Sequence, residues 1–264
     1  MKGGWRGWAV GSPAASVCVA LVLGCVGGPT EVEPPPTGVR SFLFVGNSLT
    51  YTNDLPGVLE VLLEEGLGED VYVESEARPN YGLPDHWSSG RARELIAAGG
   101  WELVILQQGP SATEGRPYLL DFAEVFAQEI RDAGAEPALY MVWPASQRTF
   151  DFDGVLDSYR TAAENVSGIF LPSGEAWRVA WESDPDLALY GPDGFHPSAL
   201  GTYLAALVMY EQITGLDARA LPASVSGTAG SVAVEETTAG VLQAAAHETN
   251  ARHALNAIRV RSRE

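Results

Sequence analysis

Three residues of the sequence could together activate a serine for nucleophilic attack. Ser48 directly follows the apolar run SFLFVGN, and His196 lies in the turn-rich segment YGPDGFHP, three residues after Asp193. A serine hydroxyl is a weak nucleophile until a base removes its proton, and the base itself must be oriented. One short loop could supply both the base and its orienting carboxylate. The alternative is a loop in which Asp193 caps a turn and His196 is merely exposed, and the spacing alone does not separate the two.

The remaining histidines are weaker candidates. His247 and His253 lie among Ala, Glu and Asn in a C-terminal stretch, where a solvated helix face is the simpler interpretation. His86 could line a pocket or serve the structure, and the sequence favours neither. No His, Asp and Glu residues cluster at metal-ligand spacing, so we expect no metal.

The segments that must position these residues alternate between short apolar runs and longer amphipathic ones. We expect strands within SFLFVG, DVYVES, WELVILQQ, EPALYMVWP and SGIFLPSG. Nearly continuous apolar strands separated by helices are typical of a parallel sheet covered on both faces, which predicts an α/β fold. Asp54 with Pro56, Gly134 and Ser198 mark helix ends. A last helix, 238–259, is expected to pack on the edge of the sheet.

Such a sheet gives Ser48 a definite place. Ligands bind at the carboxyl ends of parallel strands, near the point where the strand order reverses. Since Ser48 follows the first strand, it should lie in that crevice. A strand that ends there can hold a nucleophile both rigid and exposed.

Composition bounds the partners. The 264 residues carry a formal net charge of −18 and a sequence pI near 4.5. The chain therefore lacks the basic surface that a phosphate backbone requires, which argues against nucleic acid. An acidic surface also repels polyanions, which favours a neutral substrate.

The N-terminus reads as a targeting segment. Lys2 and Arg6 precede the apolar run AASVCVALVLG, which is too short for a comfortable membrane span. The tetrapeptide VLGC, ending at Cys25, resembles a bacterial lipobox, which implies cleavage before Cys25 and lipidation of that residue. The alternative is an ordinary secretory signal. We expect a signal peptide at 1–24, a Pro/Gly-rich spacer at 25–38 and one domain at 39–264, exported and attached to a membrane only through the N-terminal lipid.

The block Gly46-Asn47-Ser48-Leu49 resembles the Gly-Asp-Ser-Leu block of the GDSL, or SGNH, hydrolases. Asp193-x-x-His196 resembles their C-terminal block, and the two occur in the required order. The resemblance implies a flavodoxin-like three-layer α/β/α sandwich with about five parallel strands, and a Ser48, His196 and Asp193 triad that needs no cofactor. Members of that family are mainly esterases, lipases and carbohydrate deacetylases.

The resemblance also implies an oxyanion hole. Its donors would be the backbone N–H groups of Ser48 and Gly82 and a side-chain amide after the third strand. There the family has Asn, whereas this chain has Gln107 and Gln108. A glutamine amide can donate as asparagine does. The chain is similar to a bacterial subgroup with a Gln-containing third block, which favours Gln107 over Gln108.

That subgroup resemblance extends over roughly residues 40 to 215. It includes the strand end Tyr-Met-Val-Trp-Pro at 140–144 and the segment His-Pro-Ser-Ala-Leu-Gly-Thr-Tyr-Leu-Ala-Ala at 196–206. Gly82 also admits a simpler explanation, a turn glycine with positive φ. Asn47 stands where the family has Asp, and its amide can still bond neighbouring loops.

Aromatic side chains after the strands could form a pocket wall for a sugar ring. The candidates for the wall are Asn47, Tyr81, His86, Trp87 and Trp143. For the tryptophans, and Trp143 above all, burial in the core is the alternative. The preferred hypothesis is a serine esterase that removes short acyl groups, acetyl above all, from small molecules or glycans. The other is an inactive protein of the same fold that binds glycans at the cell envelope.

Overall fold

The computed structural model describes residues 1–3 and 32–253. The fold described below is that of residues 32–253. The expected signal peptide and the lipidation site at Cys25 lie outside the described residues.

Among the described residues, five parallel strands form the central sheet in the order β2-β1-β3-β4-β5. They are β1 (Arg40–Gly46), β2 (Val71–Ala77), β3 (Leu103–Leu106), β4 (Glu136–Tyr140) and β5 (Ile169–Leu171). From Ser41 to Gly46 every residue of β1 is buried, as is all of β3. Burial on both faces explains why these strands read as continuous apolar runs.

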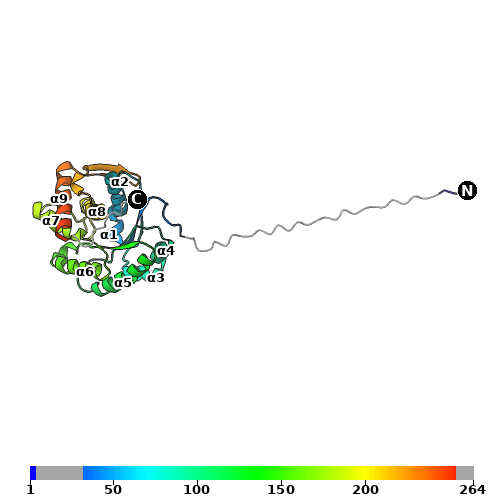
Figure 1. Ribbon diagram of the computed structural model, residues 1–264, viewed down its shortest axis with the longest axis horizontal. Coiled ribbons are helices and arrows are strands. Elements are labelled where there is room, and N and C mark those ends of the chain that lie inside the picture. Colours follow the sequence, from blue (N-terminus) through cyan, green and yellow to red (C-terminus); the bar gives the residue numbers. More distant parts are fainter. Residues whose placement is uncertain (4–31, 254–264) are drawn as a thin grey trace. The chain divides into compact units, whose positions relative to one another are not determined.

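Helices cover the two faces of this sheet (Figure 1). One layer holds α3 (Leu83–Ser89), α4 (Arg91–Ala98), α5 (Arg116–Asp132) and α6 (Phe152–Asn165). The other holds α1 (Ser48–Tyr51), α2 (Leu55–Leu67), α7 (Ser173–Ser183), α8 (Ala199–Thr214) and α9 (Glu236–His253). The expected α/β/α sandwich is therefore confirmed.

The helix ends follow local chemistry. The side chain of Asp54 accepts the N–H of Gly57, and Pro56 stands in the first turn of α2. Ser198 caps α8 by accepting the N–H of Gly201 at 3.2 Å. Gly134 follows α5 with φ 84°, a conformation that glycine adopts at little cost.

The C-terminal part differs from expectation in the position of its last helix. Helix α9 packs mainly against α7 and α8, not against the sheet edge, because α8 already covers that face. The segment before it contains an antiparallel hairpin, β6 (Ser224–Gly227) and β7 (Gly230–Ala233), which packs on α2. Short segments rich in Ser, Gly and Thr give no apolar alternation by which to predict such a hairpin.

The shorter elements are the 3-10 turns η1 (Thr52–Asp54), η2 (Ser146–Asp151) and η3 (Ala218–Ala220). No helix in the described ranges 1–3 and 32–253 is both long and apolar enough to cross a bilayer.

Candidate active site

An open cavity of about 570 Å³ lies where β1, β2 and β3 end. Its wall comes from the loops after those three strands, from α5 and from the segment beside His196. The lining residues are Asn47, Ser48, Leu49, Asn80, Tyr81, Gly82, Pro84, Asp85, Gln108, Gly109, Tyr118 and Phe195. The sheet order reverses at β1, between β2 and β3, so the cavity occupies the position that parallel sheets use for ligands.

Ser48 begins α1, two residues after the end of β1, and is half-buried on the cavity wall. As the first residue of a helix, its backbone N–H has no intrahelical acceptor. Neither that N–H nor the hydroxyl has a hydrogen-bond partner within residues 1–3 and 32–253. Ser48 therefore presents a free hydroxyl and a free amide donor at the same wall.

Asn47 ties together the loops that follow three strands. Its Nδ2 donates to the carbonyl oxygens of Tyr81 at 2.9 Å and Gln108 at 3.0 Å, and its Oδ1 accepts the N–H of Leu49. The two donated bonds require an amide, because an ionised aspartate has no hydrogen to give. The substitution of Asn for the family's Asp thus has a structural reason in this chain.

Asp193 and His196 form a hydrogen-bonded pair. Oδ2 of Asp193 lies 2.5 Å from Nδ1 of His196, and Oδ1 accepts the N–H groups of Phe195 and His196 at 2.9 Å each. The bond to His196, supported by those backbone donors, lowers the pKa of Asp193 to about 2. A carboxylate bound at Nδ1 fixes the proton there and leaves Nε2 as the basic atom.

Contacts from three directions hold the His196 loop. Nε1 of Trp143 donates to the Phe195 carbonyl at 3.0 Å, and the Ser146 N–H donates to that of Gly194 at 2.8 Å. Asn53, which follows α1, donates from Nδ2 to the Pro197 carbonyl at 2.9 Å. Asn53 therefore joins the segment that starts at Ser48 directly to the residue after His196. No feature of the sequence indicates this role, since the two partners are 144 residues apart.

Gln107 is completely buried and does not line the cavity. Its Oε1 accepts the N–H of Asn47 at 2.8 Å and the hydroxyl of Thr50 at 2.9 Å. The N–H of Asn47 can only donate, so it fixes the orientation of the amide. Nε2 of Gln107 is shielded from solvent and has no partner among the described residues. The preference for Gln107 as the oxyanion donor was therefore wrong: this side chain supports the loop from beneath.

Gln108 lines the cavity. Its Oε1 accepts the N–H of Leu83 at 2.5 Å, which leaves Nε2 as a donor with no partner among the described residues. The hydroxyl of buried Tyr159 accepts the N–H groups of Gln108 and Gly109 and donates to the Gly109 carbonyl at 2.7 Å. Of the two glutamines, Gln108 is the one placed to donate to a bound ligand.

Gly82 also lines the cavity, and its backbone is extended, with φ −103°. The explanation by a positive-φ turn is therefore wrong. A Cβ at this position would lie 2.7 Å from Nε2 of Gln108, so glycine is needed for close approach. The N–H of Gly82 donates to Oδ2 of Asp85 at 2.8 Å, and this donor is engaged in the resting structure.

Of the candidates for the pocket wall, Asn47 and Tyr81 line the cavity and three do not. His86 is fully buried, and its Nε2 donates to the Gly46 carbonyl at 2.7 Å. Trp143 is fully buried and stacks on Trp177, with ring centroids 3.8 Å apart. Trp87 packs edge-on against Phe126 of α5, outside this cavity. Their large apolar surfaces are better satisfied between sheet and helices than in an open crevice.

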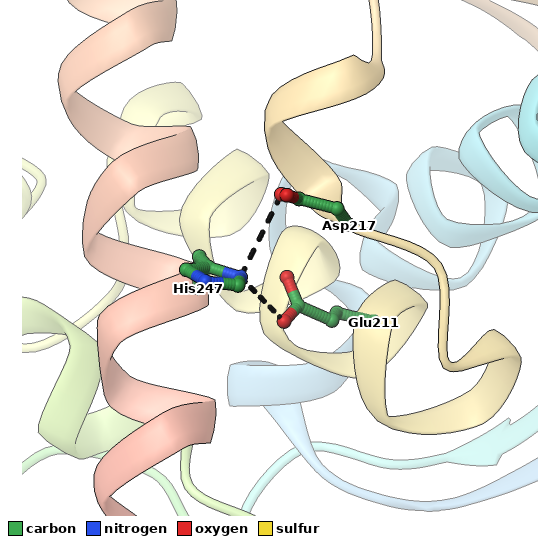
Figure 2. Close-up of side chains that lie close together, drawn as sticks. All are labelled: Glu211, Asp217 and His247. Atoms are coloured by element: carbon green, nitrogen blue, oxygen red, sulfur yellow. Dashed lines mark hydrogen bonds and ion pairs between the residues drawn. The ribbon is translucent and has the colours of Figure 1, made fainter.

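A second cluster of titratable groups joins α8, η3 and α9 (Figure 2). Nδ1 of His247 lies 2.9 Å from Oε1 of Glu211 and 3.6 Å from Oδ1 of Asp217. Their ligand atoms lie within 4.8 Å of one another, an arrangement that the sequence spacing did not reveal. However, Arg219 binds both oxygens of Asp217, which lowers the pKa of that carboxyl, and Ala218 donates to Glu211. A metal ion would have to compete with the guanidinium of Arg219 for Asp217, so the cluster is better described as a polar contact that links α8, η3 and α9.

The expectation of a solvated face for His247 and His253 was also wrong. Both are half-buried, and Nδ1 of His253 lies 2.9 Å from a guanidinium nitrogen of Arg160. The helix that carries them is covered by α7 and α8.

Comparison with known proteins gives matches among solved structures. No family model matches the chain, and no curated protein does. A protein from Slackia heliotrinireducens assigned to the SGNH hydrolases is 24% identical, with a TM-score of 0.57 over 66% of this chain and 98% of its own. A DUF4886 family protein from Bacteroides uniformis is 18% identical, with a TM-score of 0.64 over 80% and 94%. The acetyl xylan esterase AlAXEase is 15% identical, with a TM-score of 0.52 over 65% and 98%.

The chain has the fold of the SGNH hydrolases. The likeness covers nearly the whole of each of these structures and at least 65% of this chain. At such identities the likeness concerns the fold, and activity has to be argued from the site.

Proposed function

We propose that the protein is a serine esterase in which Ser48 is the nucleophile, His196 the general base and Asp193 the residue that orients it. The observation that carries the proposal is the 2.5 Å bond between Asp193 and His196, in a loop whose Phe195 lines the same cavity as the free hydroxyl of Ser48. Asn53 holds that loop to the Ser48 segment. A binding protein would require neither an oriented imidazole nor an unpaired serine.

In this mechanism Ser48 Oγ attacks the ester carbonyl carbon while Nε2 of His196 takes the hydroxyl proton. The carbonyl π electrons move to oxygen, and the N–H of Ser48 and Nε2 of Gln108 donate to that oxyanion. The intermediate collapses by breaking the bond to the alcohol oxygen, which receives the proton from His196. Water then attacks the acyl-enzyme with the same base and frees Ser48 and the acid.

The role of Gly82 requires a small rearrangement. Its N–H, the family's usual donor, is bound to Asp85 in the resting structure. It could serve the oxyanion only if substrate displaced that carboxylate. The two free donors, Ser48 N–H and Gln108 Nε2, therefore carry the proposal. The Ser48 hydroxyl also has to engage His196, and such bonds often tighten only when substrate binds.

We infer that the substrate is a short acyl ester, acetyl above all, on a small molecule or glycan. The cavity volume of about 570 Å³ is ordinary for a small-ligand site, and Tyr81, Tyr118 and Phe195 offer aromatic faces for a sugar ring. One protein of the same fold is named an acetyl xylan esterase, which is compatible with this substrate class.

We also propose that the protein is exported and anchored by a lipid on Cys25, with no nucleic-acid partner. The sequence features behind this are the cationic, apolar N-terminus and the strongly acidic composition. Cys25→Ser should move the protein from the detergent phase to the aqueous phase in a detergent partition assay of the producing cells. If the two proteins partition alike, the anchor is excluded.

Activity and covalent trapping together test the esterase. The domain from residue 38 onward should hydrolyse p-nitrophenyl acetate faster than its longer homologues, and a fluorophosphonate should add one label to it. Ser48→Ala should lose both the label and the activity, while Ser111→Ala, also on a loop at the carboxyl edge, should keep both. Labelling and hydrolysis that persist in Ser48→Ala would exclude this nucleophile, and a protein that neither hydrolyses nor reacts would favour the glycan-binding alternative.

A further inference from the structure

The cavity wall carries a single charge among the described residues that form it. Eleven of these residues are neutral, with amide, hydroxyl, aromatic or apolar side chains, and the twelfth is Asp85. A lone charge on a small, partly enclosed surface dominates the electrostatic potential that a ligand meets there. Asp85 can therefore influence which ligands bind in the cavity.

Asp85 lies near the start of α3, where one carboxylate oxygen is engaged and the other is free. Oδ2 accepts the N–H of Gly82 at 2.8 Å, whereas Oδ1 has no hydrogen-bond partner within the described ranges. The residue is exposed, so its free oxygen can meet a ligand. The bond to Gly82 keeps the carboxylate beside the proposed reaction centre, since a Cβ built on Gly82 would lie 2.7 Å from Nε2 of Gln108.

Asp85 forms no ion pair in the described part of the chain, and an arginine beside Tyr81 is already engaged. That arginine, Arg78, binds Glu76 at 2.5 Å and lies over the ring of Tyr81. Asp193, on the neighbouring loop, adds a second carboxylate, because its lowered pKa keeps it ionised. Both carboxylates therefore contribute negative potential to the cavity.

We propose that Asp85 makes the site selective for the charge of its ligand: it admits esters whose alcohol part is neutral or cationic and rejects those that carry a carboxylate. This rests on the proposed esterase function and narrows its substrate class. The free Oδ1 accepts a hydrogen bond from a hydroxyl or ammonium group of the alcohol part. A substrate carboxylate beside Asp85 would be repelled by its like charge, and the described residues of the cavity wall include no cationic side chain to bind it.

Two pairs of aryl acetates of similar shape separate charge from size. The first pair is 3-acetoxybenzoate and 3-acetoxybenzamide, and the second is 3-acetoxyphenyltrimethylammonium and 3-tert-butylphenyl acetate. The protein should have a higher kcat/KM for 3-acetoxybenzamide than for 3-acetoxybenzoate. It should also have a higher kcat/KM for 3-acetoxyphenyltrimethylammonium than for 3-tert-butylphenyl acetate. Comparing each ratio between protein variants cancels the intrinsic reactivity of the esters.

Asp85→Asn removes the charge and keeps an oxygen that can accept the Gly82 N–H. In this variant the first ratio of kcat/KM should shift toward the carboxylate ester and the second toward the tert-butyl ester, each by roughly three- to tenfold at low salt. Asp70→Asn is the matched control, because Asp70 is exposed and precedes β2, at the opposite edge of the sheet from the cavity. It changes the net charge equally and should leave the ratios as they are. Unchanged ratios in Asp85→Asn, or equal shifts in both variants, would overturn the proposal.

A binding measurement that needs no hydrolysis tests the charge selection separately from the esterase activity. The acetamides that correspond to the four esters can be titrated into Ser48→Ala protein and followed by ligand-detected NMR. If no ester is hydrolysed but the acetamides bind with the same charge preference, and Asp85→Asn removes it, the esterase fails and the charge selection stands. If the esters are hydrolysed without an Asp85-dependent preference, the selection fails alone. Failure of all four acetamides to bind, with no hydrolysis, would overturn both.

Discussion

The side-chain amide of Gln108 accepts the backbone N–H of Leu83 at 2.5 Å, so the loops after β3 and β2 fix each other. That bond settles which end of the amide is the oxygen, and it points the free donor of Gln108 away from Leu83. The second glutamine, Gln107, has its oxygen held by Asn47 and Thr50 and no access to the cavity. Two adjacent residues of one type therefore have separable roles.

Gln108→Glu should abolish most of the activity while preserving the fold. The variant keeps an oxygen for Leu83 and replaces the donor with a negative charge beside the developing oxyanion, so kcat should fall by about 100-fold or more. Steady-state kinetics and urea denaturation measure the two effects. Gln107→Leu should instead lower the free energy of unfolding by about 2–4 kcal/mol, because two buried donors lose their acceptor. The opposite pattern would return the catalytic role to Gln107.

Gly82→Ala tests the close contact between Gly82 and Gln108. The backbone at 82 is extended and accepts alanine without strain, but the new Cβ would lie 2.7 Å from Nε2 of Gln108. We expect the amide to be displaced and kcat to fall by roughly tenfold or more, with unfolding changed by less than about 1 kcal/mol. Gly90→Ala is unsuitable as a control because its φ is 82°, whereas Gly240→Ala has open space around it in α9. Full activity in Gly82→Ala would show that the contact does not matter.

Asn47→Asp introduces the residue that SGNH hydrolases have in this block and should nevertheless destabilise this protein. The variant cannot donate to the carbonyl oxygens of Tyr81 and Gln108, and it places a carboxylate against both. The free energy of unfolding at neutral pH should fall by about 1–3 kcal/mol, with lower kcat because the loops around Ser48 loosen. Denaturant unfolding at about pH 4 and pH 7 distinguishes the effect of the negative charge from that of the lost amide donors, since protonation of the new carboxylate should reduce the loss of stability. A variant as stable as the parent protein would refute the role of the amide.

Asn53→Gly tests the link between the Ser48 and His196 segments. Asn53 has φ 55°, a conformation that glycine adopts readily, so the substitution removes the bonds to Pro197 and Thr202 without backbone strain. We predict that kcat falls by about tenfold, because the base is held less firmly. The rate of fluorophosphonate labelling of Ser48 should fall in parallel. Unchanged labelling would mean that the His196 loop does not depend on Asn53.

Buried His86 should make stability depend on pH. Burial lowers the pKa of His86 from 6.5, so the unfolded chain binds a proton that the folded protein does not. The contribution of neutral His86 to the free energy of unfolding is therefore complete above pH 6.5, the pKa in the unfolded chain. This contribution is lost as the pH falls from there through the lowered pKa of the folded protein. His86→Gln keeps a donor for the Gly46 carbonyl and has no such proton. Between about pH 7.5 and 5.5 the free energy of unfolding should decline less in the variant; equal slopes would contradict the prediction.

The architecture and the order of the motifs could be predicted from the sequence alone. Short apolar runs that alternate with longer amphipathic ones are typical of strands buried on both faces, so β1 and β3 and the parallel sheet could be predicted before any contact was known. Ser48 follows the first strand, which sends it to the carboxyl edge, and the spacing of Asp193 and His196 lets them meet within one loop. These inferences depend on local order, which the chain itself carries.

Which polar groups reach the cavity depends on contacts that form only in the folded protein. Adjacent residues leave a strand in opposite directions, so the burial of Gln107 and the exposure of Gln108 depended on the neighbours that each one meets. The burial of His86 and Trp143 and the link from Asn53 to Pro197 likewise arise from contacts between segments. Composition and spacing cannot fix such contacts, because they depend on how the loops of three strands pack against one another.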